Sequence, residues 1–84
     1  MRVTVISPAA AVFDGEADSL VAPAFDGEVG ILPRHAPFLT LLGEGRLSIR
    51  VGNEDRHLRV RGGILQVADD IVRVVAESAE EESV

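Results

Sequence analysis

Short runs of alternating apolar and polar residues, separated by turn residues, make up most of this chain. No segment shows the apolar stripe, with a period of about 3.6 residues, that indicates an amphipathic helix. Clusters of Gly, Pro, Asn and Asp recur about every 6 to 12 residues, a spacing typical of β-sandwiches and β-barrels. The pattern therefore predicts an all-β domain of about nine short strands. We expect these strands at residues 2–7, 9–13, 19–25, 28–32 and 38–42, in both arms of a hairpin within 46–61, and at 64–68 and 71–76.

The clearest predicted element is the hairpin at residues 46–61. Apolar and polar residues alternate along both arms, and residues 52–55 are suited to a four-residue loop. Such a loop pairs Arg50 with His57 and places the apolar residues of both arms on one face. The opposite face then carries His57 and four arginines: Arg46, Arg50, Arg59 and Arg61.

Four arginines on one face repel each other unless acidic groups neutralise them. Residues 46–63 hold five arginines and two acids, whereas the segments on either side are acidic. One explanation is a solvated face with ion pairs inside the domain, for which residues 77–82 are one candidate source of carboxylates. The other explanation is an acidic surface on a partner protein. The sequence leaves both explanations open.

The composition excludes several kinds of chemistry. The chain has 84 residues and a net charge of −6, and it lacks Cys, Lys, Trp and Tyr. Disulfides, thiolate metal sites and catalysis by cysteine or lysine are therefore impossible. The negative charge disfavours nonspecific binding to nucleic acid or to anionic lipid. No apolar run reaches transmembrane length, so we expect a single small domain that does not insert into a membrane.

Candidate acid–base groups are present, but they lack the neighbours that catalysis requires. Asp26, Glu28, His35 and His57 could each exchange a proton. No serine lies in a nucleophile-elbow motif, and no paired metal-ligand spacing such as H-E-x-x-H occurs. We therefore expect no enzyme, no metal site and no cofactor.

Residues 26–37, with the sequence D-G-E-V-G-I-L-P-R-H-A-P, combine many constrained backbone positions. The Asp-Gly pair at the start favours a tight turn. Gly30 interrupts an extended run, which indicates a bulge or the close approach of another backbone. Two prolines fix the chain on either side of His35. A loop of such defined shape is either a recognition surface or an ordinary connection between strands.

The C-terminal third predicts a second hairpin and a tail. The glycine pair before residue 64 breaks the chain ahead of this hairpin, which turns at Asp69 and Asp70. Residues 77–84 are acidic and lack a hydrophobic face, so we expect them to fray. We therefore divide the chain into a β-domain at residues 1–76 and an acidic tail at residues 77–84.

Several of these motifs point to one family. The motif D-G-E-x-G-I-L-P-x-H-A-P is specific, and the glycine pair and the closing V-V-A-E-S-A-E run follow it in matching order and spacing. Over residues 3–80 the chain resembles the N-terminal domain of the epsilon subunit of bacterial F-type ATP synthases. The resemblance implies a flattened sandwich of two antiparallel sheets with about ten short strands. It also implies a non-catalytic subunit of the rotor that clamps the gamma subunit to the c-ring and couples proton flow to ATP synthesis.

The resemblance assigns roles to five residues. Asp26 and Glu28 match an acidic loop that faces the c-ring, where a carboxylate contacts an arginine of the ring. Ser7, His35 and Thr40 match positions that lie towards gamma. The residue at the position of Arg34 varies in the family, so no role is carried over to it. The implied location is the cytoplasmic face of the bacterial plasma membrane, as a peripheral subunit.

The length departs from the family pattern. Typical relatives continue after the A-E-S-A-E strand into a two-helix hairpin that inhibits ATP hydrolysis and in some species binds ATP. This chain ends at Val84, so we expect neither inhibition nor nucleotide binding. Either the natural subunit is short or the chain is a fragment, and the acidic tail slightly favours the first. The alternative function is a free-standing β-domain that binds another protein and is unrelated to ATP synthase.

Overall fold

The computed structural model describes residues 1–82, and these residues form strands but no helix. Within this part of the chain, no helix is therefore long and apolar enough to cross a bilayer. The all-β prediction is confirmed. The strands number eight rather than about ten, in part because two predicted strands are merged into one strand of 15 residues. They are β1 (Arg2–Ile6), β2 (Ala11–Glu16), β3 (Ser19–Ala24), β4 (Gly27–Ile31), β5 (Phe38–Leu41), β6 (Glu44–Val51), β7 (Glu54–Ala68) and β8 (Ile71–Glu81).

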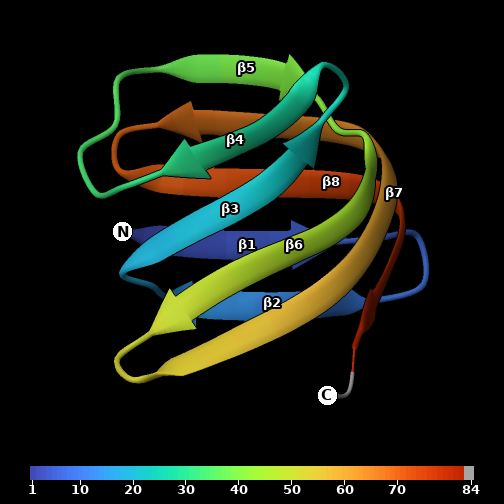
Figure 1. Cartoon of the computed structure of the whole chain (residues 1–84), viewed down its shortest axis with the longest axis horizontal. Helices are drawn as coiled ribbons and strands as arrows, with labels where there is room; N and C mark the ends of the chain where they lie inside the picture. Colours follow the sequence, from blue (N-terminus) through green and yellow to red (C-terminus); the bar gives the residue numbers. More distant parts are fainter. Residues whose placement is uncertain (83–84) are drawn as a thin grey trace.

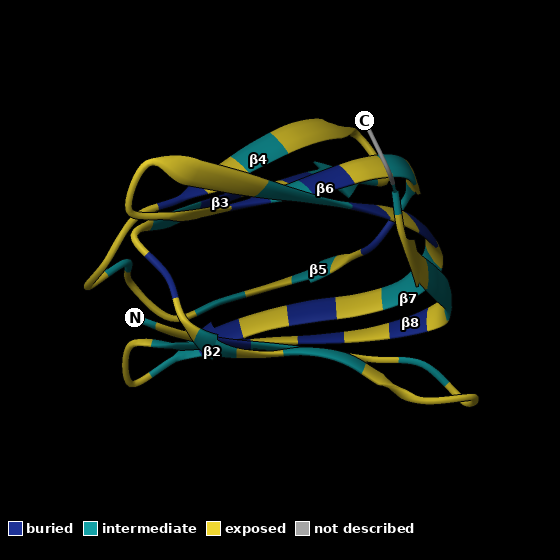
Figure 2. Ribbon diagram, turned by 90° about the horizontal axis from the view of Figure 1, so that it is seen from below, coloured by how far each residue is buried: buried dark blue, intermediate teal, exposed yellow. Residues whose placement is uncertain are grey.

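One continuous hydrogen-bonded sheet folds over on itself to give the two layers of a sandwich (Figures 1 and 2). The strand order is β2-β1-β8-β7-β6-β3-β4, and β5 also pairs with β7. The lower layer of Figure 2 contains β5, the second half of β7, the first part of β8, β1 and β2. The upper layer contains the end of β8, the first half of β7, β6, β3 and β4. All pairs are antiparallel except β1 with β8, which is parallel. The predicted sandwich is thus confirmed, but its layers are not two separate antiparallel sheets.

Strand β7 passes from the upper to the lower layer through a corner at Gly62 and Gly63 (Figure 1). Their φ angles are 64° and 111°, which residues with side chains rarely adopt. A Cβ atom on Gly63 would lie 1.9 Å from the carbonyl oxygen of Val75 on β8. The prediction that the glycine pair breaks the chain is therefore wrong. The pair bends one strand, and β7 keeps the same register with β8 on both sides of the corner.

The hairpin of β6 and β7 confirms the predicted apolar face but not the predicted register. Arg50 lies opposite Asp55 rather than His57, because the turn contains only Gly52 and Asn53. A φ of 62° at the first of these two residues alone is typical of a type II′ hairpin turn. The register is shifted by two residues from the prediction. Since successive side chains alternate between faces, a shift of two leaves every side chain on its predicted face.

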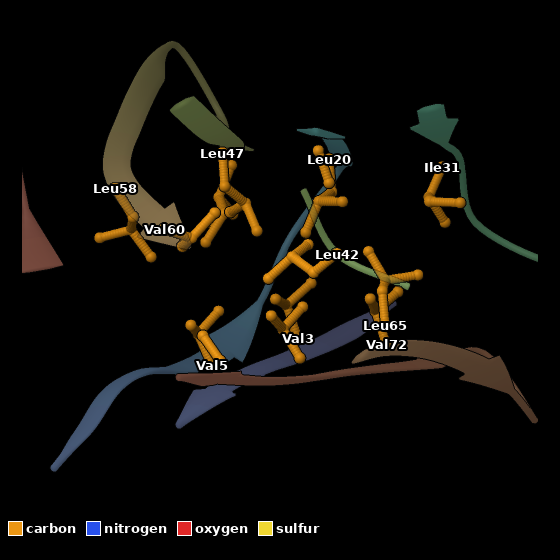
Figure 3. Close-up of a cluster of buried hydrophobic side chains, with 14 of the residues drawn as sticks. Val3, Val5, Leu20, Ile31, Leu42, Leu47, Leu58, Val60, Leu65 and Val72 are labelled. Carbon is orange, nitrogen blue, oxygen red and sulfur yellow. The ribbon is translucent and has the colours of Figure 1, made fainter. Parts of the chain in front are cut away.

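The core lies between the two layers and contains no buried polar side chain among the described residues. Buried and exposed positions alternate along β7 and β8, as the bands of colour in Figure 2 show. Figure 3 shows how apolar side chains from both layers meet, with these labelled in the interior: Val3, Val5, Leu20, Ile31, Leu42, Leu47, Leu58, Val60, Leu65 and Val72. Burial of this face fixes which alternate positions of each strand lie on the outer surface.

Most other predicted strands end within two residues of the observed limits, and β2 and β8 are the exceptions. Strand β2 continues past its predicted end at residue 13, through Asp14 and Gly15, because it pairs with the whole of β1. The predicted hairpin at residues 64–76 is confirmed, with a two-residue turn at Asp69 and Asp70. Their φ angles are 53° and 60°, a conformation that Asp tolerates better than most residues.

The prediction that the acidic tail frays is wrong for residues 77–81. These residues extend β8, and residues 78–81 pair with residues 58–61 of β7 around the corner. The N–H of Glu82 also donates to the carbonyl oxygen of His57 at 2.8 Å. The predicted boundary after residue 76 therefore falls inside a strand. Residues 83–84 of the predicted tail lie outside the described residues.

Candidate interaction surfaces

The turn between β3 and β4 forms an acidic tip. Asp26 and Glu28 are both exposed there, and within residues 1–82 neither carboxylate makes an ion pair. The structure thus brings the two predicted c-ring-facing residues to one place. The tip also exposes 66% of Phe25, which the sequence did not single out. Gly30 on β4 has no atom of another segment within 4 Å of the position of a Cβ, and the pairing of β3 with β4 continues through it without a shift in register. Both predicted alternatives, a bulge and a close backbone approach, are therefore wrong.

The loop between β4 and β5 has a defined shape. The N–H of His35 donates to the carbonyl oxygen of Leu32 at 3.2 Å, which closes a turn around Pro33 and Arg34. The imidazole of His35 lies edge-on to the ring of Phe38, with 5.7 Å between ring centroids. Its Nδ1 also lies 2.7 Å from the carbonyl oxygen of Ala36. The half-buried His35 is therefore held by its own loop.

The three residues predicted to face gamma do not form one cluster: two lie in the lower layer, and the third lies in the loop that joins the two layers. Ser7 lies in the turn after β1, where its N–H donates to the carbonyl oxygen of Ala10 at 2.9 Å. Thr40 is half-buried on β5, opposite Leu65 of β7. His35 lies in the β4–β5 loop, and Figure 1 shows this loop and the β1–β2 turn at opposite edges of the molecule. A partner that contacts all three residues would extend along the whole lower layer.

An exposed row of apolar side chains crosses the outer face of the lower layer. Leu41 of β5 pairs with Ile64 of β7, Ile64 with Val75 of β8, and Val75 with Ile6 of β1. These four side chains, the apolar row, are each between 41% and 58% exposed. With neighbouring strands about 4.8 Å apart, the row is about 14 Å long. Its ends adjoin two predicted gamma-facing residues, because Ser7 follows the first strand of the row and Thr40 precedes Leu41.

Pairs of neighbouring apolar residues in the sequence indicate this row, although the simple alternation of apolar and polar residues does not. Each member of the row has an apolar neighbour in sequence, in the pairs Val5-Ile6, Leu41-Leu42, Ile64-Leu65 and Val74-Val75. In each pair one side chain is buried in the core and the other is exposed. Strands that are apolar on both faces are typical of sheets that are covered on both sides. Identifying the row itself also requires the pairing between strands that are distant in sequence.

The predicted basic face lies on β6 and β7, and acids of the same domain contact or adjoin it. The Nε of Arg46 lies 2.7 Å from Oε1 of Glu82, and an NH atom of Arg50 lies 3.5 Å from Oδ1 of Asp55. Arg59 is placed between Arg46 on β6 and Glu80 on β8. These neighbours favour ion pairs inside the domain over an uncovered basic surface.

The remaining members of this face also have polar neighbours. Arg61 lies between Glu44 of β6 and Ser78 of β8. The Nδ1 of His57 lies 2.9 Å from the hydroxyl oxygen of Ser48. Exposed ion pairs of this kind stabilise a fold only weakly, by about 0 to 1 kcal/mol each. Glu80 and Glu82 thus place carboxylates beside this face, from the segment 77–82 that the sequence offers as one source.

Two kinds of small-molecule site are not found in the described part of the chain. Residues 1–82 contain no pocket. They also contain no group of three or more His, Asp or Glu side chains that could hold a metal ion. The candidate functional sites are therefore two surfaces, the apolar row and the acidic tip.

The sequence profile described as "ATP synthase, Delta/Epsilon chain, beta-sandwich domain" matches residues 1–82. The chain belongs to this family. The ATP synthase epsilon chain of Acidithiobacillus ferridurans is 51% identical over 78 residues, which cover 93% of this chain and 55% of that protein. The epsilon chain of Dehalococcoides mccartyi is 42% identical over 80 residues, covering 95% of this chain and 57% of that protein. The epsilon resemblance is confirmed, and the chain spans a little over half the length of these relatives.

Solved structures of ATP synthases contain chains with the same epsilon-type fold. One comes from the Euglena gracilis mitochondrial ATP synthase, OSCP/F1/c-ring, with a TM-score of 0.87 over 94% of this chain and 51% of that chain. Another comes from the central stalk/c-ring of the Tetrahymena thermophila mitochondrial enzyme, with a TM-score of 0.80 over 95% of this chain and 65% of that chain. Both are 21% identical to this chain, so they establish a shared fold.

Proposed function

We propose that this epsilon-type domain is a non-catalytic subunit of the central stalk of a proton-translocating F-type ATP synthase. In this role it clamps the gamma subunit to the c-ring and couples proton flow to ATP synthesis. It acts as a peripheral subunit at the cytoplasmic face of the bacterial plasma membrane. Family membership supports the proposal, as do the ATP synthase assemblies that contain chains of the same fold.

The observation that carries the proposal is the arrangement of two chemically different surfaces at one end of the sandwich. The apolar row ends at Leu41, and the acidic tip contains Phe25. The N–H of Phe25 donates to the carbonyl oxygen of Leu41 at 3.0 Å, so the two surfaces adjoin. An exposed apolar patch rimmed by polar residues is typical of a protein interface. A domain with an apolar face and an adjoining acidic tip can hold two partners of different chemistry together.

We assign each surface to one partner. The apolar row docks on gamma together with Ser7, Thr40 and His35, because apolar area gives a stable permanent interface. Asp26 and Glu28 contact polar, positively charged loops of the c-ring, because their carboxylates are exposed and lack an internal partner. Arg46, Arg50, Arg59 and Arg61 lie at the edge of either contact at most, because acids of the domain already adjoin them.

Replacing Val75 by glutamate tests the gamma interface. The substitution places a carboxylate in the middle of the apolar row, where docking would bury it without a partner. We expect the chain to bind gamma at least about tenfold more weakly, which corresponds to about 1.4 kcal/mol. The measurement is co-purification and titration with the gamma-containing head of the ATP synthase. Val21→Glu is the matched control, because Val21 is similarly exposed, at 38% against 44%, but lies on β3 of the opposite layer.

Three results of this experiment have distinct meanings. Loss of binding in Val75→Glu alone supports the assignment of the lower layer to gamma. Equal loss in both variants, or in neither, contradicts that assignment. A wild-type chain that recovers no ATP synthase subunit contradicts the proposed function and favours the free-standing protein-binding domain.

A further inference from the structure

Two segments far apart in sequence meet at one edge of the lower layer. The β4–β5 loop and the β7–β8 turn lie side by side there, on the same edge as the N-terminus (Figure 1). The N–H of Arg34 in the loop donates to Oδ1 of Asp70 in the turn at 2.8 Å. The carbonyl oxygen of Asp70 accepts a second bond, from the N–H of Arg2 on β1 at 3.1 Å. Asp70 therefore connects the β4–β5 loop both to the β7–β8 turn and to strand β1.

Arg34 has an unfavourable backbone conformation. Its φ is 65°, and it follows Pro33 in the turn that the bond from His35 to Leu32 closes. Proline in the second position and a positive φ in the third are the features of a type II turn, whose third position favours Gly or Asn. An arginine there costs free energy that some other contact must offset. The turn's own hydrogen bond does not use the N–H of this third residue, so this N–H is available to Asp70.

The hydrogen bond to Asp70 offsets the free-energy cost of the left-handed conformation at Arg34. A carboxylate that accepts from a backbone N–H makes a charge-assisted hydrogen bond, which is stronger than a neutral one. Because the bond holds the backbone of Arg34, it also fixes the position of the next residue, His35, whose ring packs on Phe38. Asp70 itself has a φ of 60° in the two-residue turn after β7. One carboxylate thus links two turns that both contain left-handed residues.

We propose that Asp70 is a positioning residue, which holds the β4–β5 loop in the shape that docks on gamma. The inference rests on the proposed function for its partner, and on the Arg34 contact for its mechanism. Asp70 acts through Arg34 and the loop, not by touching gamma. Without the carboxylate, the loop leaves the strained conformation at Arg34, and His35 is presented in several orientations.

Three variants separate this role from the role of Asp70 in its own turn. Asp70→Gly keeps a residue that tolerates positive φ but removes the acceptor. Asp70→Asn keeps both the tolerance of positive φ and an acceptor oxygen. Asp69→Gly changes the neighbouring turn residue, which also has positive φ but no bond to the loop. A general weakening of the β7–β8 turn would affect Asp69→Gly as well, whereas the proposed role affects Asp70→Gly most, Asp70→Asn less and Asp69→Gly not at all.

Two measurements on the full 84-residue chain test the inference. The first is amide hydrogen exchange at Arg34, measured by NMR without any partner. We expect about tenfold faster exchange in Asp70→Gly, a smaller increase in Asp70→Asn, whose amide oxygen accepts only a neutral bond, and a rate near wild type in Asp69→Gly. The second is the rate of association with the gamma-containing head. We expect this rate to fall about fivefold in Asp70→Gly, by less in Asp70→Asn, and not in Asp69→Gly, because binding that needs a conformational change is slower.

A double-mutant cycle adds an internal check. Arg34→Gly removes the cost of the left-handed conformation, so the loop no longer depends on the carboxylate. In an Arg34→Gly background, Asp70→Gly should therefore slow association less than it does in the wild-type background. Equal slowing in both backgrounds would show that Asp70 acts by some route other than Arg34, and would overturn the inference.

The remaining outcomes distinguish the inference from the proposed function. Unchanged exchange at Arg34 in Asp70→Gly overturns the mechanism, whatever gamma does. Faster exchange with unchanged association overturns the docking role of the loop while leaving the proposed function intact. A wild-type chain that does not bind gamma overturns the proposed function and, with it, the docking role.

Discussion

Replacing Gly63 by alanine is expected to destabilise the domain by about 3 kcal/mol or more, which is a large part of the stability of a small domain. The new Cβ would lie 1.9 Å from the carbonyl oxygen of Val75 and 2.8 Å from the Cα of Ala76. These are backbone atoms, so no side-chain rotation can relieve the overlap. The strands β7 and β8 would have to separate at the corner where β7 passes between the two layers. We expect a clear fall in the urea midpoint, followed by far-UV circular dichroism because the chain lacks Trp and Tyr.

Gly52→Ala is the matched control for this substitution. Gly52 also has a positive φ, 62°, but apart from its two chain neighbours no residue has an atom within 4 Å of the position of its Cβ. Its replacement therefore costs only the backbone strain of the left-handed conformation, about 1 to 2 kcal/mol. The difference between the two variants isolates the steric overlap at the corner. Equal destabilisation of both would contradict the close packing of β7 on β8.

Some residue patterns in the sequence predict features of the fold, and others do not. Alternation reports which side of a strand is buried, and Leu47, Ile49, Leu58 and Val60 were assigned to the correct face. It does not report loop length, so the turn at Gly52 and Asn53 was predicted two residues too long. Acidic residues such as Glu80 and Glu81 look unsuited to a strand by composition. Their pairing with β7 overrides that weak preference.

The features of the candidate site also differ in how far the sequence predicts them, according to whether their residues are close together or far apart in the sequence. Asp26 and Glu28 are neighbours in sequence, so their common position on the acidic tip could be predicted. The apolar row could not, because Ile6 and Val75 become neighbours only through the parallel pairing of β1 with β8. The contact of Arg34 with Asp70 spans 36 residues in sequence and likewise depends on the folded topology.

Reversing both charges of the acidic tip is expected to uncouple proton transport from ATP turnover. In Asp26→Arg, Glu28→Arg the two exposed carboxylates become guanidinium groups. If the tip contacts positively charged loops of the c-ring, as we propose, the reversal replaces attraction by repulsion, which costs several kcal/mol at an interface. The core and strand pairing are untouched, because both side chains are exposed at the turn between β3 and β4. We expect ATP-driven proton pumping in inverted membrane vesicles to fall several-fold while the rate of ATP hydrolysis is retained.

The position of the charge, and not the change in net charge, should decide this result. Glu54→Arg changes the net charge as much as Glu28→Arg does, but Glu54 lies at the turn between β6 and β7, at the opposite end of the upper layer (Figure 1). We expect normal pumping in Glu54→Arg, reduced pumping in Glu28→Arg, and the largest loss in the double variant. Raising the salt concentration should weaken the repulsion by screening and partly restore pumping. Unchanged pumping in the double variant would show that the acidic tip does not contact the c-ring.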